Sequence, residues 1–154
     1  MDRLTTKYFG ELEYNESVVF HFPAGIPGFE DQDRFLFVDQ ARNRPLVFMQ
    51  SIKTPDLCFI AVPVFVVDPE YRLEVCPEDL AAIDLPLDHA PHIGQDVLCL
   101  GLVNVSKYAG PTVNLAAPIV VNLEARKGLQ AIRPTGDYSY EHPLLPNEEM
   151  APCS

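Results

Sequence analysis

The sequence predicts an all-β fold, in which a mainly antiparallel sheet closes or nearly closes into a small barrel, with one short helix near residues 77–83. Short runs of β-branched and aromatic residues recur about every ten residues, a spacing typical of sandwiches and barrels. The 15 prolines among 154 residues are about twice the average usage and disfavour long helices. A closed sheet leaves no strand edge exposed, so a barrel is the simplest arrangement for these strands.

Most of the predicted strands lie in the N-terminal half. Residues 6–14 and 18–22 flank a polar turn, and we expect them to pair as an opening hairpin. Residues 23–28 hold two prolines and two glycines, which neither a helix nor a strand tolerates, so a rigid loop is expected there. Further strands are expected at residues 34–38, 46–51, 57–62, 64–67 and 71–75.

The predicted helix covers residues 77–83. Pro77 suits the first helical position, and two acidic residues follow it at the positive end of the helix dipole. After it we expect a polar loop over residues 84–95 and a core strand over residues 97–105. The last strands are expected at residues 112–115, 118–123 and 129–132, with a bulge or edge at Pro118 because proline cannot donate a ladder hydrogen bond.

The length and the absence of a long linker predict one domain over residues 1–145 and a flexible tail over residues 146–154. The first residues are polar and lead into no apolar segment, so we expect no secretory signal and a cytoplasmic location. The most apolar run, residues 59–67, is far shorter than the roughly 20 residues of a transmembrane helix, and no membrane contact is expected. The chain is expected to be monomeric on its own.

The four cysteines form no CxxC pair, so their spacing indicates neither a zinc site nor a redox dithiol. In a reducing compartment we expect free thiols. Cys58 and Cys99 lie in apolar strand patterns, where free cysteine behaves as a small core residue. Cys153 belongs to the predicted tail.

The formal net charge of −11 excludes direct binding to nucleic acid, which depends on basic residues that neutralise phosphates. The acidic residues concentrate in residues 68–88, where seven acids face the single base Arg72. We call residues 68–88 the acidic segment. It is either a solvated face or a docking surface for a basic partner. The carboxylates proposed to contact a partner are Glu70, Glu74, Glu78 and Asp79.

Residues that could carry catalysis are scattered. His89 and His92 are residues of a type that binds metal ions. Pro91 prevents the helix that would align them, so a solvated loop is favoured over a metal site. No nucleophile elbow, phosphate-binding loop or zinc-protease motif is present in the sequence. We therefore expect that the protein is not an enzyme and that it binds no cofactor. The alternatives are a small-ligand-binding barrel and a hydrolase assembled from His21, His142 and distant carboxylates.

Several motifs occur in one order along the chain. Residues 22–31 read Phe-Pro-Ala-Gly-Ile-Pro-Gly-Phe-Glu-Asp, residues 49–51 read Met-Gln-Ser, and residues 114–122 read Asn-Leu-Ala-Ala-Pro-Ile-Val-Val-Asn. Asp68-Pro69-Glu70-Tyr71 and His142-Pro143-Leu144 add to them. This pattern resembles the flagellar assembly factor FliW family from about residue 5 to residue 145. The chain departs from it at Glu141, where many relatives have a basic residue.

The resemblance implies a non-enzymatic regulator that binds flagellin and CsrA, a small basic repressor of flagellin mRNA translation. It implies a partner switch: when flagellin is secreted, the freed factor captures CsrA and relieves repression. The motif residues are expected mainly to preserve the fold, with positive φ angles at two glycines and side-chain bonds to backbone from two asparagines. They are Gly25, Ile26, Pro27, Gly28, Phe29, Glu30, Asn114, Pro118, Asn122 and Gly128.

Overall fold

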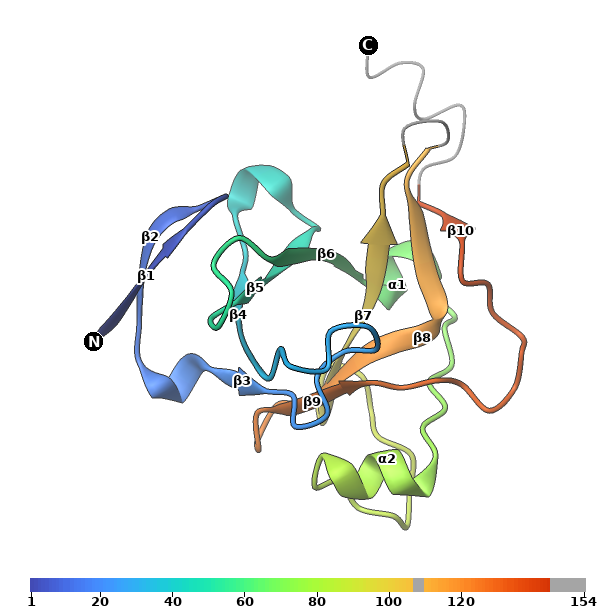
Figure 1. Cartoon of the computed structure of the whole chain (residues 1–154). Coiled ribbons are helices and arrows are strands. Elements are labelled where there is room, and N and C mark those ends of the chain that lie inside the picture. Colours follow the sequence, from blue (N-terminus) through green and yellow to red (C-terminus); the bar gives the residue numbers. More distant parts are fainter. Residues whose placement is uncertain (107–109, 145–154) are drawn as a thin grey trace.

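The computed structural model describes residues 1–106 and 110–144 (Figure 1). Its strands are β1 (Asp2–Thr6), β2 (Gly10–Tyr14), β3 (Phe20–His21), β4 (Arg34–Val38), β5 (Val47–Ser51), β6 (Cys58–Pro63), β7 (Val97–Asn104), β8 (Thr112–Asn122), β9 (Lys127–Gln130) and β10 (His142–Pro143). Its helices are α1 (Val64–Val67) and α2 (Pro77–Ala82), with 3-10 turns η1 (Glu16–Val18) and η2 (Ala41–Asn43). The predicted tail and Cys153 lie outside the described residues.

The main sheet closes into a barrel. Its eight strands run in the order β10-β8-β7-β6-β5-β4-β3-β9, and β8 also pairs with β9, so every strand except β10 belongs to the ring. All pairs are antiparallel except β3 with β9, which is parallel. The prediction of a closed, mainly antiparallel barrel is confirmed.

Side chains fill the barrel. Phe22, Phe35, Met49, Leu100 and Ile119 are fully buried in one apolar cluster. Two glycines permit close approach of neighbouring elements: a Cβ at Gly128 would lie 2.7 Å from the Phe22 ring, and one at Gly101 would overlap the Val113 side chain. The small-ligand-binding alternative therefore has no support in the packing of the ring.

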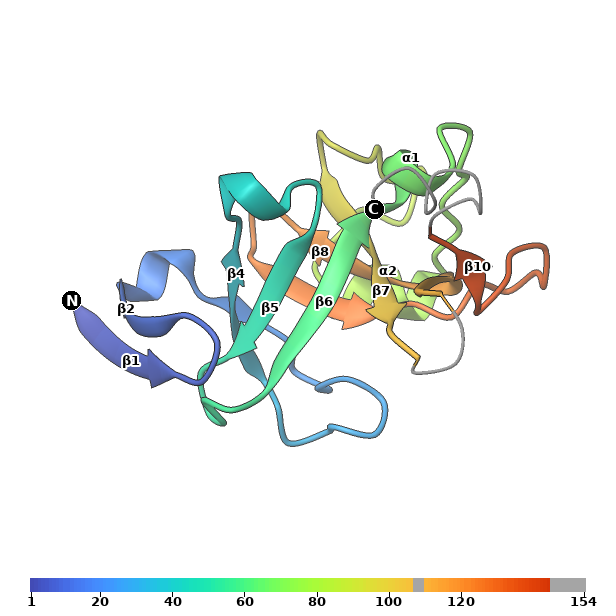
Figure 2. The same cartoon turned by 90° about the horizontal axis from the view of Figure 1, so that it is seen from above.

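The predicted opening hairpin is wrong in its pairing. β1 pairs with β2, whereas β3 joins the barrel between β4 and β9. A tight turn reverses the chain earlier than expected: the Thr6 hydroxyl donates to Gly10 O (2.9 Å), and the Phe9 amide donates to Thr6 Oγ1 (2.9 Å). The hairpin covers the outside of the barrel beside β4 (Figure 2), where Leu4 and Tyr14 pack in one cluster with Leu36.

Two further strand predictions are wrong. Residues 64–67 form the helical turn α1, in which Val64 is buried and the Asp68 amide donates to Val64 O (2.9 Å). The β-branched composition favoured a strand, but burial of Val64 overrode that propensity. Residues 71–75 belong to no strand, because side chains rather than a neighbouring strand hold their backbone.

The central and C-terminal predictions are largely confirmed. α2 ends one residue before the predicted boundary, residues 84–95 form a loop, and β7 is a core strand. The expected strands at 112–115 and 118–123 are one strand, β8, with a register shift opposite Leu100 and Leu102 that leaves Pro118 outside the ladder. β9 begins at Lys127, two residues earlier than expected, and ends at Gln130.

The predicted core cysteines differ in burial. Cys99 is buried and Cys58 is half-buried, and the described cysteines are free thiols. Burial raises the pKa of the Cys58 thiol to about 11 and that of Cys99 to about 12. In the part of the chain that the structure describes, no helix is both long enough and apolar enough to span a membrane.

Candidate functional site

The acidic segment runs from the end of α1 through α2 to the loop after it. Glu70 follows a turn in which its amide donates to Asp68 Oδ1 (2.9 Å), and its side chain is exposed. Glu78 and Asp79 lie in the first turn of α2, the former exposed and the latter half-exposed. These three proposed contact residues make no side-chain hydrogen bond or ion pair among the described residues.

Glu74 differs from the other three, because it is engaged within the chain. Its carboxylate lies 2.9 Å from the guanidinium of Arg133, whose side chain is only 2% exposed. The same Oε1 accepts a hydrogen bond from the Thr135 hydroxyl (2.5 Å). Glu74 therefore anchors the acidic segment to the C-terminal part of the chain.

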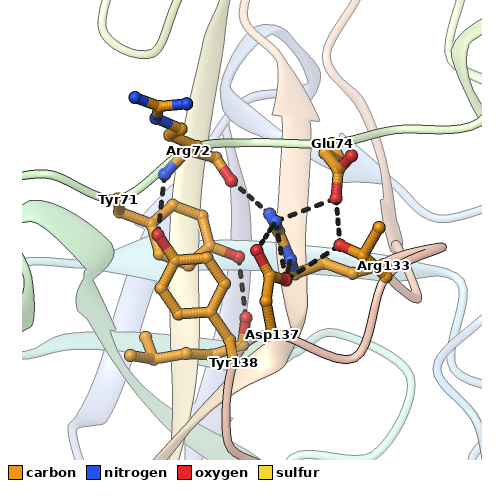
Figure 3. Close-up of polar contacts among 8 residues, drawn as sticks. Tyr71, Arg72, Glu74, Arg133, Asp137 and Tyr138 are labelled. Carbon is orange, nitrogen blue, oxygen red and sulfur yellow. Dashed lines mark hydrogen bonds and ion pairs between the residues drawn. The ribbon is translucent and has the colours of Figure 1, made fainter.

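Arg133 is the centre of this contact (Figure 3). Its guanidinium donates to the Glu74 carboxylate, to the Arg72 carbonyl and, through two nitrogens at 3.0 Å, to Asp137. It lies over the Tyr138 ring at 4.4 Å and near the Tyr71 ring at 5.5 Å. We call Tyr71, Arg72, Glu74, Arg133, Thr135, Asp137 and Tyr138 the Arg133 junction.

The two tyrosines of the Arg133 junction extend it into the core and along the backbone. Their rings lie 4.5 Å apart, the Tyr71 hydroxyl donates to Leu115 O (2.7 Å), and the Arg72 amide donates to the Tyr138 hydroxyl (3.1 Å). A buried guanidinium is tolerated only when its charge is paired and its donors are satisfied. Arg133 meets both conditions. The junction therefore attaches the acidic segment to β8 and to the chain that follows β9.

The ionisation of the Arg133 junction follows from these contacts. Burial alone lowers the pKa of Arg133, but hydrogen bonds with Asp137 and Tyr71 outweigh it and raise that pKa overall. The hydrogen bond from Thr135 is the largest influence on Asp137 and, with Arg133, lowers the pKa of its carboxyl group. Burial raises the pKa of the Tyr71 hydroxyl. The Arg133 guanidinium and the Asp137 carboxylate are therefore both charged at neutral pH.

A cavity of about 510 Å³ lies beyond the C-terminal end of α2. Its wall includes the carboxylates of Asp84, Asp96 and Glu124 together with His89. Asp84 pairs with Lys127 at 2.8 Å, and Asp96 accepts a hydrogen bond from the His92 amide (2.8 Å). We call this the acidic cavity. Its charge suits a basic side chain.

The histidines do not converge on a reaction centre. His89 and His92 are exposed in the loop after α2, as expected, and each lies near a different aspartate, Asp88 or Asp96. His21 is on β3 and its Nε2 lies 3.8 Å from Glu16, whereas the His142 ring contacts the Pro143 carbonyl. Among the described residues, no group of three or more His, Cys, Asp or Glu could hold a metal ion.

The Gly-Pro loop, residues 23–30, is a rigid turn rather than an open loop. The Phe29 amide donates to Ile26 O (2.6 Å), and Gly28 has φ +87 after Pro27, the arrangement of a type II turn. The Gly28 amide donates to the Glu30 carboxylate (2.9 Å). Gly25 has φ +67, so the positive angles expected at both glycines are confirmed.

The two motif asparagines bind backbone groups, as expected. Asn114 Oδ1 accepts from the amides of Ala116 and Ala117 at 3.1 and 2.9 Å, which supports the irregular part of β8. The Asn122 amide group donates to Ile83 O (2.7 Å), and its oxygen accepts from the Glu124 amide (3.0 Å). Asn122 thus connects the end of β8 to the end of α2.

Sequence reasoning missed the Arg133 junction altogether. Arg133 and its partners Arg72 and Glu74 are 61 and 59 residues apart along the chain. Arg133 lies in a run that looks like the polar end of a strand, and nothing in one sequence indicates that its side chain is buried. The one available signal was the pair of tyrosines, Tyr71 and Tyr138, each next to charged residues.

Comparisons with known proteins agree with this architecture. The sequence matches the family described as FliW protein over residues 3–144. It is 36% identical over 143 residues to the flagellar assembly factor FliW of Caldanaerobacter subterraneus subsp. tengcongensis, covering 92% of each chain. It is 32% identical over 144 residues to that of Syntrophomonas wolfei subsp. wolfei, covering 93% of this chain and 88% of the relative.

A solved structure gives the same result. The fold matches the crystal structure of the flagellar assembly factor FliW with a TM-score of 0.82 and 31% sequence identity, covering 96% of this chain and 99% of that one. Sequence and fold thus agree over nearly the whole length, and the resemblance noted in the motifs is confirmed. The chain belongs to the FliW family of flagellar assembly factors.

Proposed function

We propose that this chain acts in flagellum assembly as a cytoplasmic, non-enzymatic regulator that binds flagellin and the translational repressor CsrA. Capture of CsrA would relieve repression of flagellin mRNA. Membership of the FliW family over residues 3–144 is the observation that carries this proposal. The absence of converging catalytic groups among the described residues is compatible with a role in binding.

The charge of the chain supports a basic partner. At −11 the protein repels RNA, but its carboxylates attract a basic protein such as CsrA. The exposed carboxylates of Glu70, Glu78 and Asp79 are the proposed contacts. Since Glu74 is paired with Arg133, we assign it a positioning role instead.

The range of these charges limits how they act. The Debye length is about 8 Å at physiological salt, so the acidic segment must dock close to the RNA path of CsrA or change its shape. Contacts at the rim of an interface affect mainly the association rate. The acidic segment should therefore accelerate docking more than it slows release.

Association kinetics with purified CsrA test this proposal. The variant with Glu70→Gln, Glu78→Gln and Asp79→Asn should associate more slowly at low salt, with dissociation nearly unchanged. The control variant with Glu11→Gln, Asp33→Asn and Asp56→Asn changes net charge equally at exposed positions outside the segment. An association rate that responds equally to both variants would remove the acidic segment from the interface, and absence of any CsrA binding would refute the partner.

The partner switch has its own test. By linkage, flagellin must weaken CsrA binding by the same factor by which CsrA weakens flagellin binding. Titration of the preformed CsrA complex with flagellin should release CsrA. A stable ternary complex with unchanged CsrA affinity would refute the switch and leave the family assignment intact.

A further inference from the structure

A second cavity, of about 330 Å³, lies on the outer surface of the barrel. Phe48 on β5 pairs with Ile60 on β6, and both line this cavity. The neighbouring residues Met49 and Ala61 are fully buried in the inner cluster, so alternation along the strands directs Phe48 and Ile60 outward. Its wall is completed by Tyr8, Phe9, Gln40, Arg42, Asn43 and Cys58. We call it the aromatic pocket.

Three separate parts of the chain build this wall: the β1–β2 turn, the η2 region and the paired strands β5 and β6. Tyr8 and Phe9 come from the turn between β1 and β2, and the Phe9 ring meets that of Phe48 edge to face with centroids 5.3 Å apart. Arg42 and Asn43 come from η2. Figure 2 shows the β1–β2 hairpin beside β4, and the 3-10 turn η2 between β4 and β5.

The wall is held in place before any partner binds. The Asn43 side-chain amide donates to Gln40 Oε1 (2.8 Å), Arg44 pairs with Asp39 (3.1 Å), and the Lys7 backbone amide donates to Pro55 O (3.3 Å). A preformed pocket loses little conformational entropy on binding. Tyr8 remains 59% exposed, so its ring is accessible to a partner.

The charge at the aromatic pocket is opposite to that of the chain. Arg42 is its only charged wall residue, is exposed, and makes no ion pair among the described residues. A second positive charge lies near the pocket, because Lys7 Nζ is 5.4 Å from the centre of the Tyr8 ring. In a chain with 22 acids and 11 bases, a pocket wall without carboxylates and with an exposed guanidinium favours a negatively charged group.

We propose that the aromatic pocket docks a large apolar side chain from an acidic segment of a partner protein, with Arg42 paired to a carboxylate that flanks the anchor. The volume is at the low end for a ligand pocket and holds about one large side chain. Aromatic anchors in such pockets, with arginine beside them, dominate the energetics of many interfaces. The aromatic pocket shares no residue with the acidic segment, and its positive charge would repel a basic partner. The proposal therefore does not depend on the identity of the partners proposed above.

Selection of displayed peptides tests this inference. A random library of 12-residue peptides on phage is selected on the immobilised full chain, and binders to the Arg42→Glu variant are removed at each round. Peptides that survive should share a large apolar residue flanked by Asp or Glu. Enrichment of basic peptides, or no enrichment over the bare surface, would overturn the proposal.

A surviving peptide, synthesised with a fluorescent label, gives the quantitative test by anisotropy. Tyr8→Ser and Arg42→Glu should each weaken binding by about tenfold or more, since each removes part of the anchor site. Both positions are exposed, so the variants should keep the melting temperature of the parent. The control Lys53→Glu makes the same charge change at an exposed residue outside the pocket and should bind normally. Binding that is indifferent to Tyr8→Ser, or equally sensitive to Lys53→Glu, would refute the assignment.

Discussion

The Gly-Pro loop and the Arg133 junction both fix chain that lies outside the strands, but they do so by different physical means. In the Gly-Pro loop the backbone itself determines the shape, through prolines, positive φ angles and a close approach between Gly25 and Glu30. In the Arg133 junction the chain forms neither helix nor strand, and one buried guanidinium holds it through carboxylates and a carbonyl. The first device is local and depends mainly on backbone sterics, whereas the second joins distant segments and depends on charge.

This contrast suggests that the two regions fail differently. A change in the Gly-Pro loop should cost a fixed amount of stability under all conditions, because steric overlap does not respond to solvent. A change at the Arg133 junction should cost an amount that varies with salt and pH. Four substitutions separate these behaviours.

The largest loss of stability is expected from Gly25→Val. A Cβ at Gly25 would lie 2.6 Å from the Glu30 carbonyl oxygen, which is backbone and cannot rotate away, and φ is +67. We expect the free energy of unfolding to fall by about 3 kcal/mol or more. Urea unfolding measures this loss, and the control Gly136→Val, where no atom lies within 4 Å of the added Cβ, should change it little. An unchanged midpoint would show that the Gly-Pro loop is not rigid.

Arg133→Met should cause the next largest loss. Removal of a buried charge partner costs about 3–5 kcal/mol when the other charge stays buried, but Glu74 and Asp137 are 41% and 56% exposed and can be hydrated. We therefore expect a loss of about 2 kcal/mol that shrinks as salt is added. The control Arg34→Met breaks the more exposed pair with Glu16 and should cost less than about 1 kcal/mol. Equal costs in the two variants would remove the distinction between the junction and a surface ion pair.

Gly28→Ala should cost less than either. Gly28 has φ +87 but no atom within 4 Å of an added Cβ, so only backbone strain is expected, about 1 kcal/mol. A thermal melt measures it, and CsrA and flagellin binding are measured on the same variant. An unchanged melting temperature with lost binding would show that the Gly-Pro loop is an interaction surface.

The smallest effect is expected from Asp137→Asn, and it should depend on pH. The pKa of Asp137 is lowered in the folded state from its ordinary value of 3.8, so this group contributes stability above that value, and the contribution disappears as pH falls through the folded pKa. Melting temperatures between pH 2 and pH 7 should separate parent from variant at neutral pH and converge in acid. Parallel curves over the whole range would contradict the role of the charge.

The same contrast explains what the sequence could predict. The Gly-Pro loop, α2 and the barrel depend on local signals such as Pro27-Gly28, Pro77 and recurring apolar runs, and these predictions are confirmed. The prediction of the opening hairpin was wrong because the Thr6 hydroxyl closes the turn, and the sequence has no Asn-Gly pair there to indicate it.

The contact residues were predicted less well for a related reason. Glu74 looked equivalent to Glu78 in the sequence, and only the fold brings Arg133 to one of them. The aromatic pocket also needs three segments in contact, and residues 8, 42 and 60 share no pattern in the sequence. Sites that depend on such distant pairs become visible only when the topology is known.

The parallel pair between β3 and β9 has a consequence for biosynthesis. His21 on β3 is in register with Lys127 on β9, so the ring closes between residues that are far apart along the chain. Contacts so distant along the chain form slowly, because a long loop must be ordered before they are made. Until β9 has emerged from the ribosome, β3 and β8 each keep an open edge that neighbouring nascent chains could pair with. The barrel is thus completed late, and a ribosome that stalls before residue 127 would release an open sheet prone to aggregate.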